Sequence, residues 1–342
     1  MASWLAPSCR GIINDTTNRE CQLMKITSIL PRSKEYPTGQ NPRIKAFYGE
    51  LRRRLRRSYK AAAEYANNLK PQIVQLNATG YQYQLDPLLM SQINSYIDAL
   101  LNEIIYGNAQ GEWSAGWWAN AYASGAYQQA SEQVVTQTQL LAADAGVTKE
   151  LPSLQYLRAE AVVMEPGFQR RLGSVYARLF EDMKGFTDVD KRNMAGIITR
   201  GMAAGQSPRV IAREMEKKGI EQDWRCLRIA STEVNNAFRS GSMDETDAVN
   251  KDVFGDSEYE MRIIHISALL PTTRPDHAAR HGTICTPAQQ KEWFATKATG
   301  SSVNCHCSQA DILVNKKTGK PMNRKLRDIL LAQRKEWTPE KV

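Results

Sequence analysis

The stretch that decides the fold runs from Arg225 to Cys307, and two motifs within it carry most of the information. The first motif, which opens a long polar helix, is Arg228-Ile229-Ala230-Ser231-Thr232-Glu233. The second begins as Arg274-Pro275-Asp276-His277-Ala278-Ala279-Arg280-His281-Gly282 and is completed further on by Asn304-Cys305-His306-Cys307. All four histidines of the 342-residue chain, and three of its six cysteines, lie between positions 265 and 307. Because these side chains are the usual metal ligands and proton carriers, site chemistry is expected here.

The composition is that of a soluble protein with a buried core. Hydrophobic residues make up 42% of the chain and charged residues 24%, and the length predicts two or three folding units. No apolar run approaches the ~20 residues that cross a bilayer, and residues 1–10 lack the pattern of a secretory signal. We therefore expect no membrane partner and a cytoplasmic setting, in which cysteines are thiols or metal ligands.

The net charge of +9 predicts an anionic partner, most simply nucleic acid. One basic cluster consists of Arg52, Arg53, Arg54, Arg56 and Arg57. A second group of lysines and arginines lies within residues 316–335. Either cluster could contact phosphate or the acidic surface of a protein, or could simply be a solvated helix face.

The N-terminal half is predicted to be helical after an extended arm. From Pro42 the apolar residues keep three-and-four spacing, which indicates an amphipathic basic helix. Asp86 followed by Pro87 is a typical helix start. A segment rich in Trp and Tyr, from Trp113 to Tyr127, is interpreted as core or oligomer interface, with a stacking platform for single strands as the alternative.

Gly146 to Pro152 is predicted to be a hinge between two domains, and shorter helices follow it. We expect a helix over 153–164, another that stops at Gly185, and a third capped by Thr187 or Asp188. Ser207-Pro208 starts the next helix, which Lys217-Lys218-Gly219 closes. A long helix is predicted over 223–249.

After Gly255 the period of the pattern changes from helical to two. Alternation over 259–267 predicts a β-strand, and 303–314 can form a second strand. Short helices are expected from Pro287 to Phe294 and over 322–337. The predicted fold class is therefore α+β, mostly α: a helical N-terminal region followed by a helical domain that carries a small β-sheet.

The cysteines suggest a metal site. Cys305 and Cys307 are two residues apart, so on an extended strand their sulfurs point to the same side. With Cys285 and either His277 or His281 they supply four donors, enough for a structural tetrahedral zinc. The alternative is a metal-free buried cluster. Apart from this zinc, no cofactor is expected. A cysteine nucleophile has less support, because no glycine-rich oxyanion loop precedes either residue.

Glu233, Arg274 and His277 are interpreted as an ion-paired network between the long helix and the sheet. No catalytic residue is predicted. No glycine-rich phosphate loop is present, which argues against a nucleotide-driven motor.

The order and spacing of the motifs resemble the phage Mu F-like head morphogenesis family over residues 185–312. The resemblance rests on helix–Gly205-x-Ser207-Pro208–helix, the Thr232-Glu233 motif, Arg274-x-x-His277-x-x-x-x-Gly282 and Asn304–Cys307. It marks as structural motif residues Arg228, Thr232, Glu233, Arg274, Gly282 and Asn304. Relatives usually end in His-Pro-Asn-Cys-Arg-Cys, whereas this chain has Ser302 and His306 at the first and fifth of these positions. These departures weaken any metal site carried over from the family.

The resemblance implies a minor capsid protein of a tailed phage, without catalytic activity. It would lie inside the virion head near the portal vertex after assembly in the host cytoplasm. The implied partners are the portal protein, the inner capsid shell or scaffold, and packaged double-stranded DNA, with no small-molecule substrate. The predicted domains are an arm (1–40), a helical docking region (41–147), a minor head protein domain (153–314) and a basic C-terminal helix or tail (315–342). The alternatives are a metal-dependent nuclease that uses the His/Cys cluster and a DNA-binding adaptor.

Overall fold

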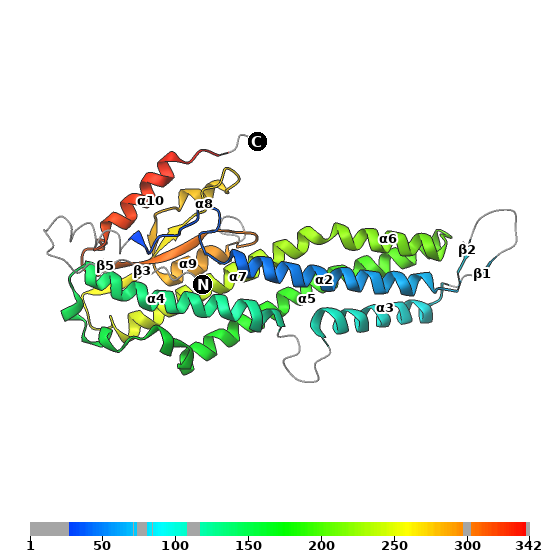
Figure 1. Cartoon of the computed structure of the whole chain (residues 1–342), viewed down its shortest axis with the longest axis horizontal. Coiled ribbons are helices and arrows are strands. Elements are labelled where there is room, and N and C mark those ends of the chain that lie inside the picture. The colour runs from blue at the N-terminus through cyan, green and yellow to red at the C-terminus, as the bar shows by residue number, and fades with distance from the viewer. Residues whose placement is uncertain are drawn as a thin grey trace, which may run out of the picture.

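The computed structural model describes residues 27–70, 72–73, 81–83, 85–107, 117–296 and 302–339. It confirms the mostly helical α+β fold with a small antiparallel sheet. The molecule is elongated, with a helical stalk on one side and a head that contains the sheet on the other (Figure 1).

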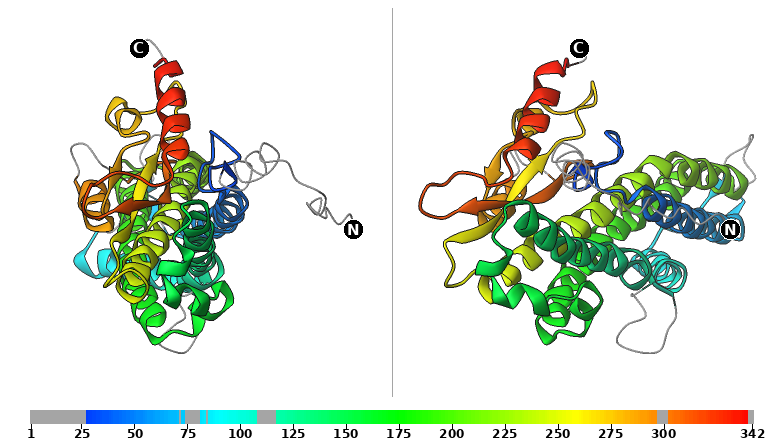
Figure 2. Two further views of the ribbon diagram at one scale, coloured as in Figure 1. Left: turned by 90° about the vertical axis from the view of Figure 1, so that its left-hand side faces the viewer. Right: turned by 60° about the vertical axis from the view of Figure 1, so that its left-hand side comes forward.

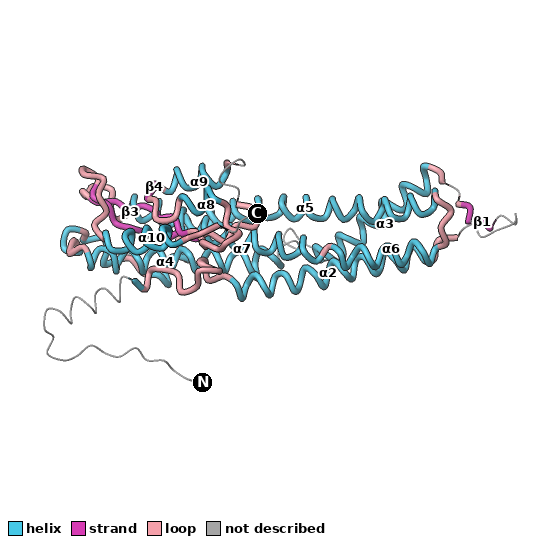
Figure 3. The backbone as a smooth tube through the Cα atoms, turned by 90° about the horizontal axis from the view of Figure 1, so that it is seen from above, coloured by secondary structure: helices cyan, strands magenta, loops and turns pink. Residues whose placement is uncertain are grey.

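The stalk is built from helices that run side by side along the long axis (Figure 1, Figure 3). They are α2 (Asn41–Asn67), α3 (Pro87–Leu101), the C-terminal part of α5 (Pro166–Ala203) and α6 (Pro208–Glu221). A π-helical turn, η1 (Asn102–Gly107), continues α3. At the far tip, β1 (Gln72–Ile73) pairs with β2 (Tyr81–Gln82), and the Tyr81 N–H donates to the Gly205 carbonyl.

The head packs helices around the three-stranded sheet. The long helix α7 (Asp223–Asp252) enters the head from the stalk and lies beside α4 (Ser124–Asp144), which η3 (Ala119–Ala123) precedes. Three short 3-10 helices connect α4 to α5: η4 (Thr148–Glu150), η5 (Pro152–Tyr156) and η6 (Ala159–Met164). The remaining elements are β3 (Tyr259–Ile266), α8 (Pro275–Ala279), β4 (Ile284–Cys285), α9 (Pro287–Ala295), β5 (Ser308–Asn315) and α10 (Arg324–Glu336).

The sheet has the order β4-β3-β5, and all its pairs are antiparallel. Ile263 lies opposite Cys285 on one side of β3, and Ile266 lies opposite Ser308 on the other. This register places the start of β5 beside the end of β3, so the residues just before β5 meet the loop that follows β3. Helix α10 projects from the head away from the stalk axis (Figure 1, Figure 2).

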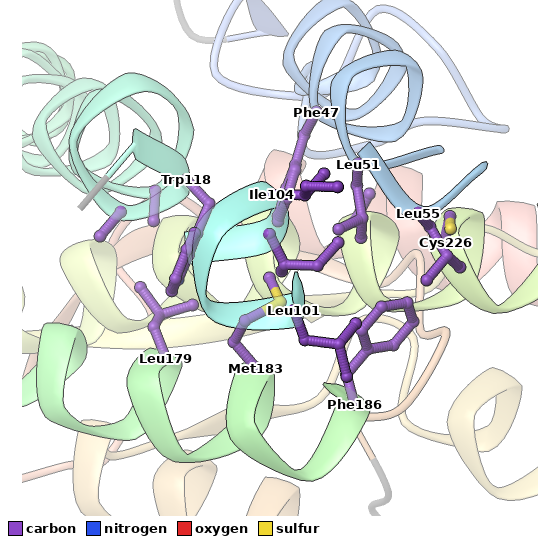
Figure 4. Packing of buried hydrophobic residues seen from close by; sticks show 14 of the residues in the cluster. Phe47, Leu51, Leu55, Leu101, Ile104, Trp118, Leu179, Met183, Phe186 and Cys226 are labelled. Atoms are coloured by element: carbon purple, nitrogen blue, oxygen red, sulfur yellow. The ribbon is translucent and has the colours of Figure 1, made fainter. Parts of the chain in front are cut away.

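Two hydrophobic clusters hold these parts together. The larger one joins α2, α3, α5, α6 and the first half of α7, and it contains Phe47, Trp118 and Phe186 (Figure 4). The smaller one joins the sheet to α4, α10 and Ile29. The larger cluster draws on residues from both sides of the predicted hinge at 146–152, as does the smaller one. The predicted domain division stays a prediction, but the two halves of the chain share their cores.

Local signals placed most helix starts correctly. The Asp86 side chain accepts the Leu89 N–H at 2.7 Å, and Ser207 and Thr286 cap α6 and α9 in the same way. The aromatic segment is core where it is described: Trp118 and Tyr127 are fully buried, which supports the core interpretation over a stacking platform. Trp113 lies outside the described residues.

Other local signals were wrong. Gly185 does not end a helix, because α5 runs unbroken for 38 residues and the Thr187 hydroxyl bonds back to carbonyls of the preceding turn instead of capping a new helix. Gly219 does not close α6, which continues to Glu221. Gly219 has no side chain, and this lets α2 approach α6. A Cβ at Gly219 would lie only 2.6 Å from Tyr59 Cβ.

Two further elements differ from the prediction. The segment 153–164 forms the 3-10 helices η5 and η6 rather than an α-helix. The strand expected over 303–314 begins only at Ser308, because Asn304 adopts a left-handed backbone with φ 50° and the chain turns there. Among the described residues, no helix is long and apolar enough to span a membrane.

Candidate metal centre

Three of the predicted metal ligands meet in the head. His277 Nδ1 lies 3.4 Å from Cys305 Sγ and 3.4 Å from Cys307 Sγ. All three ligand atoms lie within 4.8 Å of one another, and all three side chains are at least 97% buried. The cluster combines one imidazole and two thiols, a borderline-soft donor set that suits zinc.

Helix α7 holds the cysteine loop by its backbone. The Arg239 guanidinium donates to the carbonyl oxygens of Cys305 (3.1 Å) and Cys307 (2.9 Å), and the Asn235 amide donates to the Cys305 carbonyl. The Asn304 N–H donates to Thr232 Oγ1 at 2.9 Å. These contacts satisfy polar backbone groups of a loop whose two cysteines are buried and which has no strand partner at this point.

His277 is brought to the cysteines by α8 and the turn after it. Pro275 stands at the first position of α8, where its missing N–H costs nothing. The chain returns to the sheet at Gly282, whose N–H donates to the His265 carbonyl. Its φ of 79° is a left-handed conformation that glycine adopts without strain. The His277 ring then packs edge-on against Trp293 of α9, with ring centroids 4.7 Å apart.

The two thiols are electrostatically unequal. The hydrogen bond from Cys307, assisted by the Arg239 charge and by His277, holds the pKa of the Cys305 thiol well below its usual range. The same hydrogen bond and burial raise the pKa of the Cys307 thiol. The two thiols therefore do not titrate independently, and Cys305 gives up its proton more readily than Cys307.

The other two candidate ligands lie outside this group. Cys285 Sγ is 3.3 Å from Gln290 Oε1, and burial raises the pKa of its thiol. His281 uses both ring nitrogens elsewhere: Nδ1 accepts the Ser267 N–H at 3.0 Å and Nε2 lies 3.2 Å from Gln333 Oε1. In the described part of the chain, the metal-ligand group thus contains His277, Cys305 and Cys307 only.

Sequence reasoning marked Thr232 as a motif residue but missed Asn235 and Arg239, which together with it hold this cluster from α7. Thr232, Asn235 and Arg239 are three, four and seven residues apart, so they lie on one helical face. All three are buried, and Arg239 is only 1% exposed. A polar stripe on a face that must be buried was the available signal, since buried polar groups require partners.

The segment before α2 lies against the other side of the cysteine loop. The His306 ring stacks on Tyr36 with centroids 5.5 Å apart, and His306 Nδ1 lies 3.3 Å from the Glu35 carbonyl oxygen. The Thr38 hydroxyl donates to Asn235 Oδ1 at 2.7 Å. Of the predicted arm over 1–40, residues 35–38 therefore contact the head, whereas residues 1–26 lie outside the described residues.

The predicted network of Glu233, Arg274 and His277 has different neighbours from those expected. Glu233 lies beside Asp182, and burial, with the Asp182 charge adding to it, raises the pKa of Glu233 to about 7. Arg274 donates to the Val303 carbonyl at 3.4 Å, and His277 faces the sulfurs. Glu233 and Asp182 line a cleft of about 230 Å³ whose wall includes the exposed Arg228.

Two acidic residues of the same chain, Asp223 and Glu50, pair with four of the five arginines in the cluster and so offset two of its five charges. The ion pairs are Arg52–Asp223 (3.2 Å), Arg56–Asp223 (2.5 Å), Arg54–Glu50 (2.7 Å) and Arg53–Glu50. Arg54 also lies over the Trp117 ring, 4.6 Å from its centroid. Arg52 and Arg56 therefore join α2 to α7. Arg54 donates to the Ile104 carbonyl of η1 at 2.9 Å, and Arg57 is exposed.

Comparison with known proteins identifies one segment. Residues 193–310 match the family model described as Phage Mu protein F like protein. This confirms, over about a third of the chain, the resemblance seen in the motifs, and it supports a role in phage head morphogenesis. No curated protein and no solved structure matches the chain.

Proposed function

We propose that this protein is a minor capsid protein of a tailed phage, which lies near the portal vertex of the head and acts structurally in procapsid assembly. The observation that carries the proposal is the family match over residues 193–310. That segment includes the end of α5, all of α6 and α7, the strands β3 and β4, the cysteine loop and the first three residues of β5. It therefore reaches from the stalk into the head and contains every motif on which the resemblance rests.

The roles of the motif residues support a structural function. Thr232 and Asn304 join α7 to the cysteine loop, and Gly282 returns the chain to the sheet. Such contacts define a rigid shape and do not by themselves activate a substrate. In the described residues, the group of converging metal ligands includes no carboxylate, so it lacks the acid or base that a hydrolytic metal site uses.

A patch of exposed apolar side chains supports contact with a protein partner, which we assign to the portal. The patch is Ile220, Trp224 and Leu227, which are 59%, 59% and 47% exposed at the junction of α6 and α7. Large apolar side chains that gather on a surface usually mark an interface. The patch lies on the stalk where α6 leads into α7, and Trp224 lines the same cleft as Val303 of the head. A partner bound there would therefore touch both parts.

We place contact with packaged DNA on α10 rather than on the arginine cluster of α2. The arginines of α2 are largely paired within the chain, whereas Arg324, Lys325 and Arg327 are exposed on a helix that projects from the head (Figure 2). Unpaired cations release counterions when they meet phosphate, which paired cations do less readily.

The test is co-expression with the portal protein encoded in the same phage genome, followed by pull-down at physiological salt and imaging of the particles. We expect a complex in which the chain decorates the portal ring. Trp224→Ser should weaken that complex at least tenfold. Tyr156→Ser is the control and should leave the complex unchanged, because Tyr156 is also an exposed aromatic residue (78%) but lies in the head, outside the patch. Particles in which the chain lies away from the portal would overturn the location, and absence from the particles would overturn the proposal.

A further inference from the structure

We propose that His277, Cys305 and Cys307 bind a zinc ion, which closes the loop 302–307 onto the end of the sheet. The ligand set differs from the four donors expected from the sequence, because Cys285 and His281 take no part. The fourth position is assigned to water, since no further His, Cys, Asp or Glu of the described residues joins the group.

The spacing of the donor atoms fits tetrahedral zinc. With Zn–S near 2.3 Å and Zn–N near 2.05 Å, a tetrahedral angle separates sulfur and nitrogen by about 3.6 Å. Both observed separations, from His277 Nδ1 to Cys305 Sγ and to Cys307 Sγ, are 3.4 Å. The two nitrogen–sulfur separations therefore need to change by only a few tenths of an ångström. The two sulfurs lie within 4.8 Å of each other, and tetrahedral zinc would hold them about 3.8 Å apart.

The surroundings also suit a bound cation with thiolate ligands. Zinc binds thiolates, and Arg239 places a buried guanidinium on the backbone carbonyls of both cysteines, where its charge favours thiolate over thiol. The Cys307 thiol donates to Ser267 Oγ at 3.7 Å, and once the sulfur is a thiolate the Ser267 hydroxyl can donate to it instead. Metal–thiolate sites are normally supported by hydrogen-bond donors of this kind.

His265 fits as a supporting donor rather than as a ligand. Gln290 Oε1 accepts from Arg280, so the Gln290 amide donates to His265 Nδ1 at 2.8 Å. In the neutral ring the proton then lies on Nε2, which is buried without a hydrogen-bond partner in the described structure. His265 is on β3 two residues before Ser267, so it shares the sheet face of Cys307. We assign this N–H to a thiolate of the zinc site, which would have to move closer, because no sulfur accepts from it in the described structure.

Zinc at this point would tie three parts of the head together. The ligands come from α8 and from the loop before β5, and His306, between the two cysteines, stacks on Tyr36. Releasing the metal should therefore loosen both the loop and residues 35–38, while the helices of the stalk stay unchanged.

The first experiment needs only the wild-type chain. Protein purified from zinc-replete medium is expected to contain about one zinc per chain by mass spectrometry. After the metal is removed with a chelator, cobalt(II) should restore one equivalent, with the sulfur-to-cobalt charge-transfer band and the visible bands of tetrahedral cobalt. Hydrogen exchange of residues 35–38 and 302–307 should speed up on chelation. Protein that holds no zinc and gives no cobalt spectrum overturns the proposal.

The second experiment assigns the ligands. Cys305→Ser, Cys307→Ser and His277→Gln should each lower zinc affinity at least tenfold, and Cys285→Ser should not. Cys285 is the matched control, because it is also buried in the head but lies outside the ligand group. Circular dichroism confirms that each variant is folded. Equal losses in Cys285→Ser and Cys305→Ser would overturn the three-ligand assignment.

Discussion

Thr232 and Asn304 are 72 residues apart, and the backbone N–H of Asn304 donates to Thr232 Oγ1 at 2.9 Å. The Thr232 hydroxyl itself donates to the Arg228 carbonyl one turn earlier. One hydroxyl thus joins α7 to the loop that carries both cysteines. The contact is made at Asn304, whose left-handed backbone turns the chain ahead of β5.

Replacing Thr232 with valine keeps the shape of the side chain and removes the acceptor. We expect Thr232→Val to lower the free energy of unfolding by about 1 kcal/mol, the usual contribution of one hydrogen bond. Urea denaturation measures this change. Ser267→Ala serves as the control that removes a hydroxyl near Cys307 but leaves the Asn304 contact intact. A Thr232→Val chain as stable as the wild type would show that water replaces the hydroxyl at no cost.

Two helical glycines differ in the space around them, so replacing each with alanine should have opposite effects on stability. A Cβ at Gly241 would lie 2.4 Å from the Tyr127 carbonyl oxygen, a backbone atom that cannot move alone. We therefore expect Gly241→Ala to cost ~1–3 kcal/mol of stability through overpacking. Gly173 lies in α5 with nothing within 4 Å of the added carbon, so Gly173→Ala should stabilise by up to ~1 kcal/mol. Thermal unfolding of the two variants tests the pair, and a loss of stability in both would contradict it.

The pH dependence of stability should carry the signature of Asp311. Burial raises the pKa of Asp311 to about 7, against 3.8 for an exposed aspartate. The Thr246 hydroxyl lies 2.7 Å from Asp311 Oδ1 and 2.8 Å from the Ser242 carbonyl oxygen. Its single hydrogen cannot serve both, so a proton on Asp311 completes the pattern.

The sign follows from proton linkage. Between pH 4 and 7 the folded chain holds a proton on Asp311 that the unfolded chain has lost, so stability falls as pH rises through this window. Asp311→Asn keeps a donor toward Thr246 and cannot ionise. We expect the variant to equal the wild type near pH 4 and to exceed it by more than ~1 kcal/mol at pH 8. Glu233, whose pKa burial also raises to about 7, is common to both proteins and cancels. Burial raises the pKa of Glu245 to about 7 as well, and the Glu245 charge adds to the raised pKa of Asp311, so the variant also loses this repulsion. Parallel stability curves would contradict the prediction.

The arginines of α2 and α10 should behave differently toward DNA. Arg56 is paired with Asp223 at 2.5 Å and is partly exposed, so Arg56→Gln should cost no more than ~1 kcal/mol of stability and should leave the salt dependence of DNA binding unchanged. Lys325→Gln on α10 should leave stability unchanged and should reduce the salt slope by about one. Affinity measured by fluorescence anisotropy over a range of salt concentrations distinguishes the two. A slope that changes with Arg56 alone would return the DNA contact to α2.

The sequence by itself determined the features that depend on neighbouring residues. Helix starts at Asp86, Ser207 and Thr286 follow from a capping side chain and a proline, all within four residues. The strand β3 follows from its alternation, and the fold class follows from the sum of such elements. These signals are local, so no knowledge of the tertiary structure is needed to recognise them.

Only the tertiary structure decided which distant residues meet. Gly219 looked like a helix end and is a contact point for α2, because the approach of another helix outweighs the local preference of glycine. His277 and His281 are one helical turn apart and were equivalent in the sequence. The return of the chain at Gly282 turns one ring toward the sulfurs and the other toward Ser267 and Gln333. Cys285 lies outside the ligand group because the register of β4 on β3 places it opposite Ile263. Such choices depend on distances between segments that are far apart in the chain, and packing alone sets those distances.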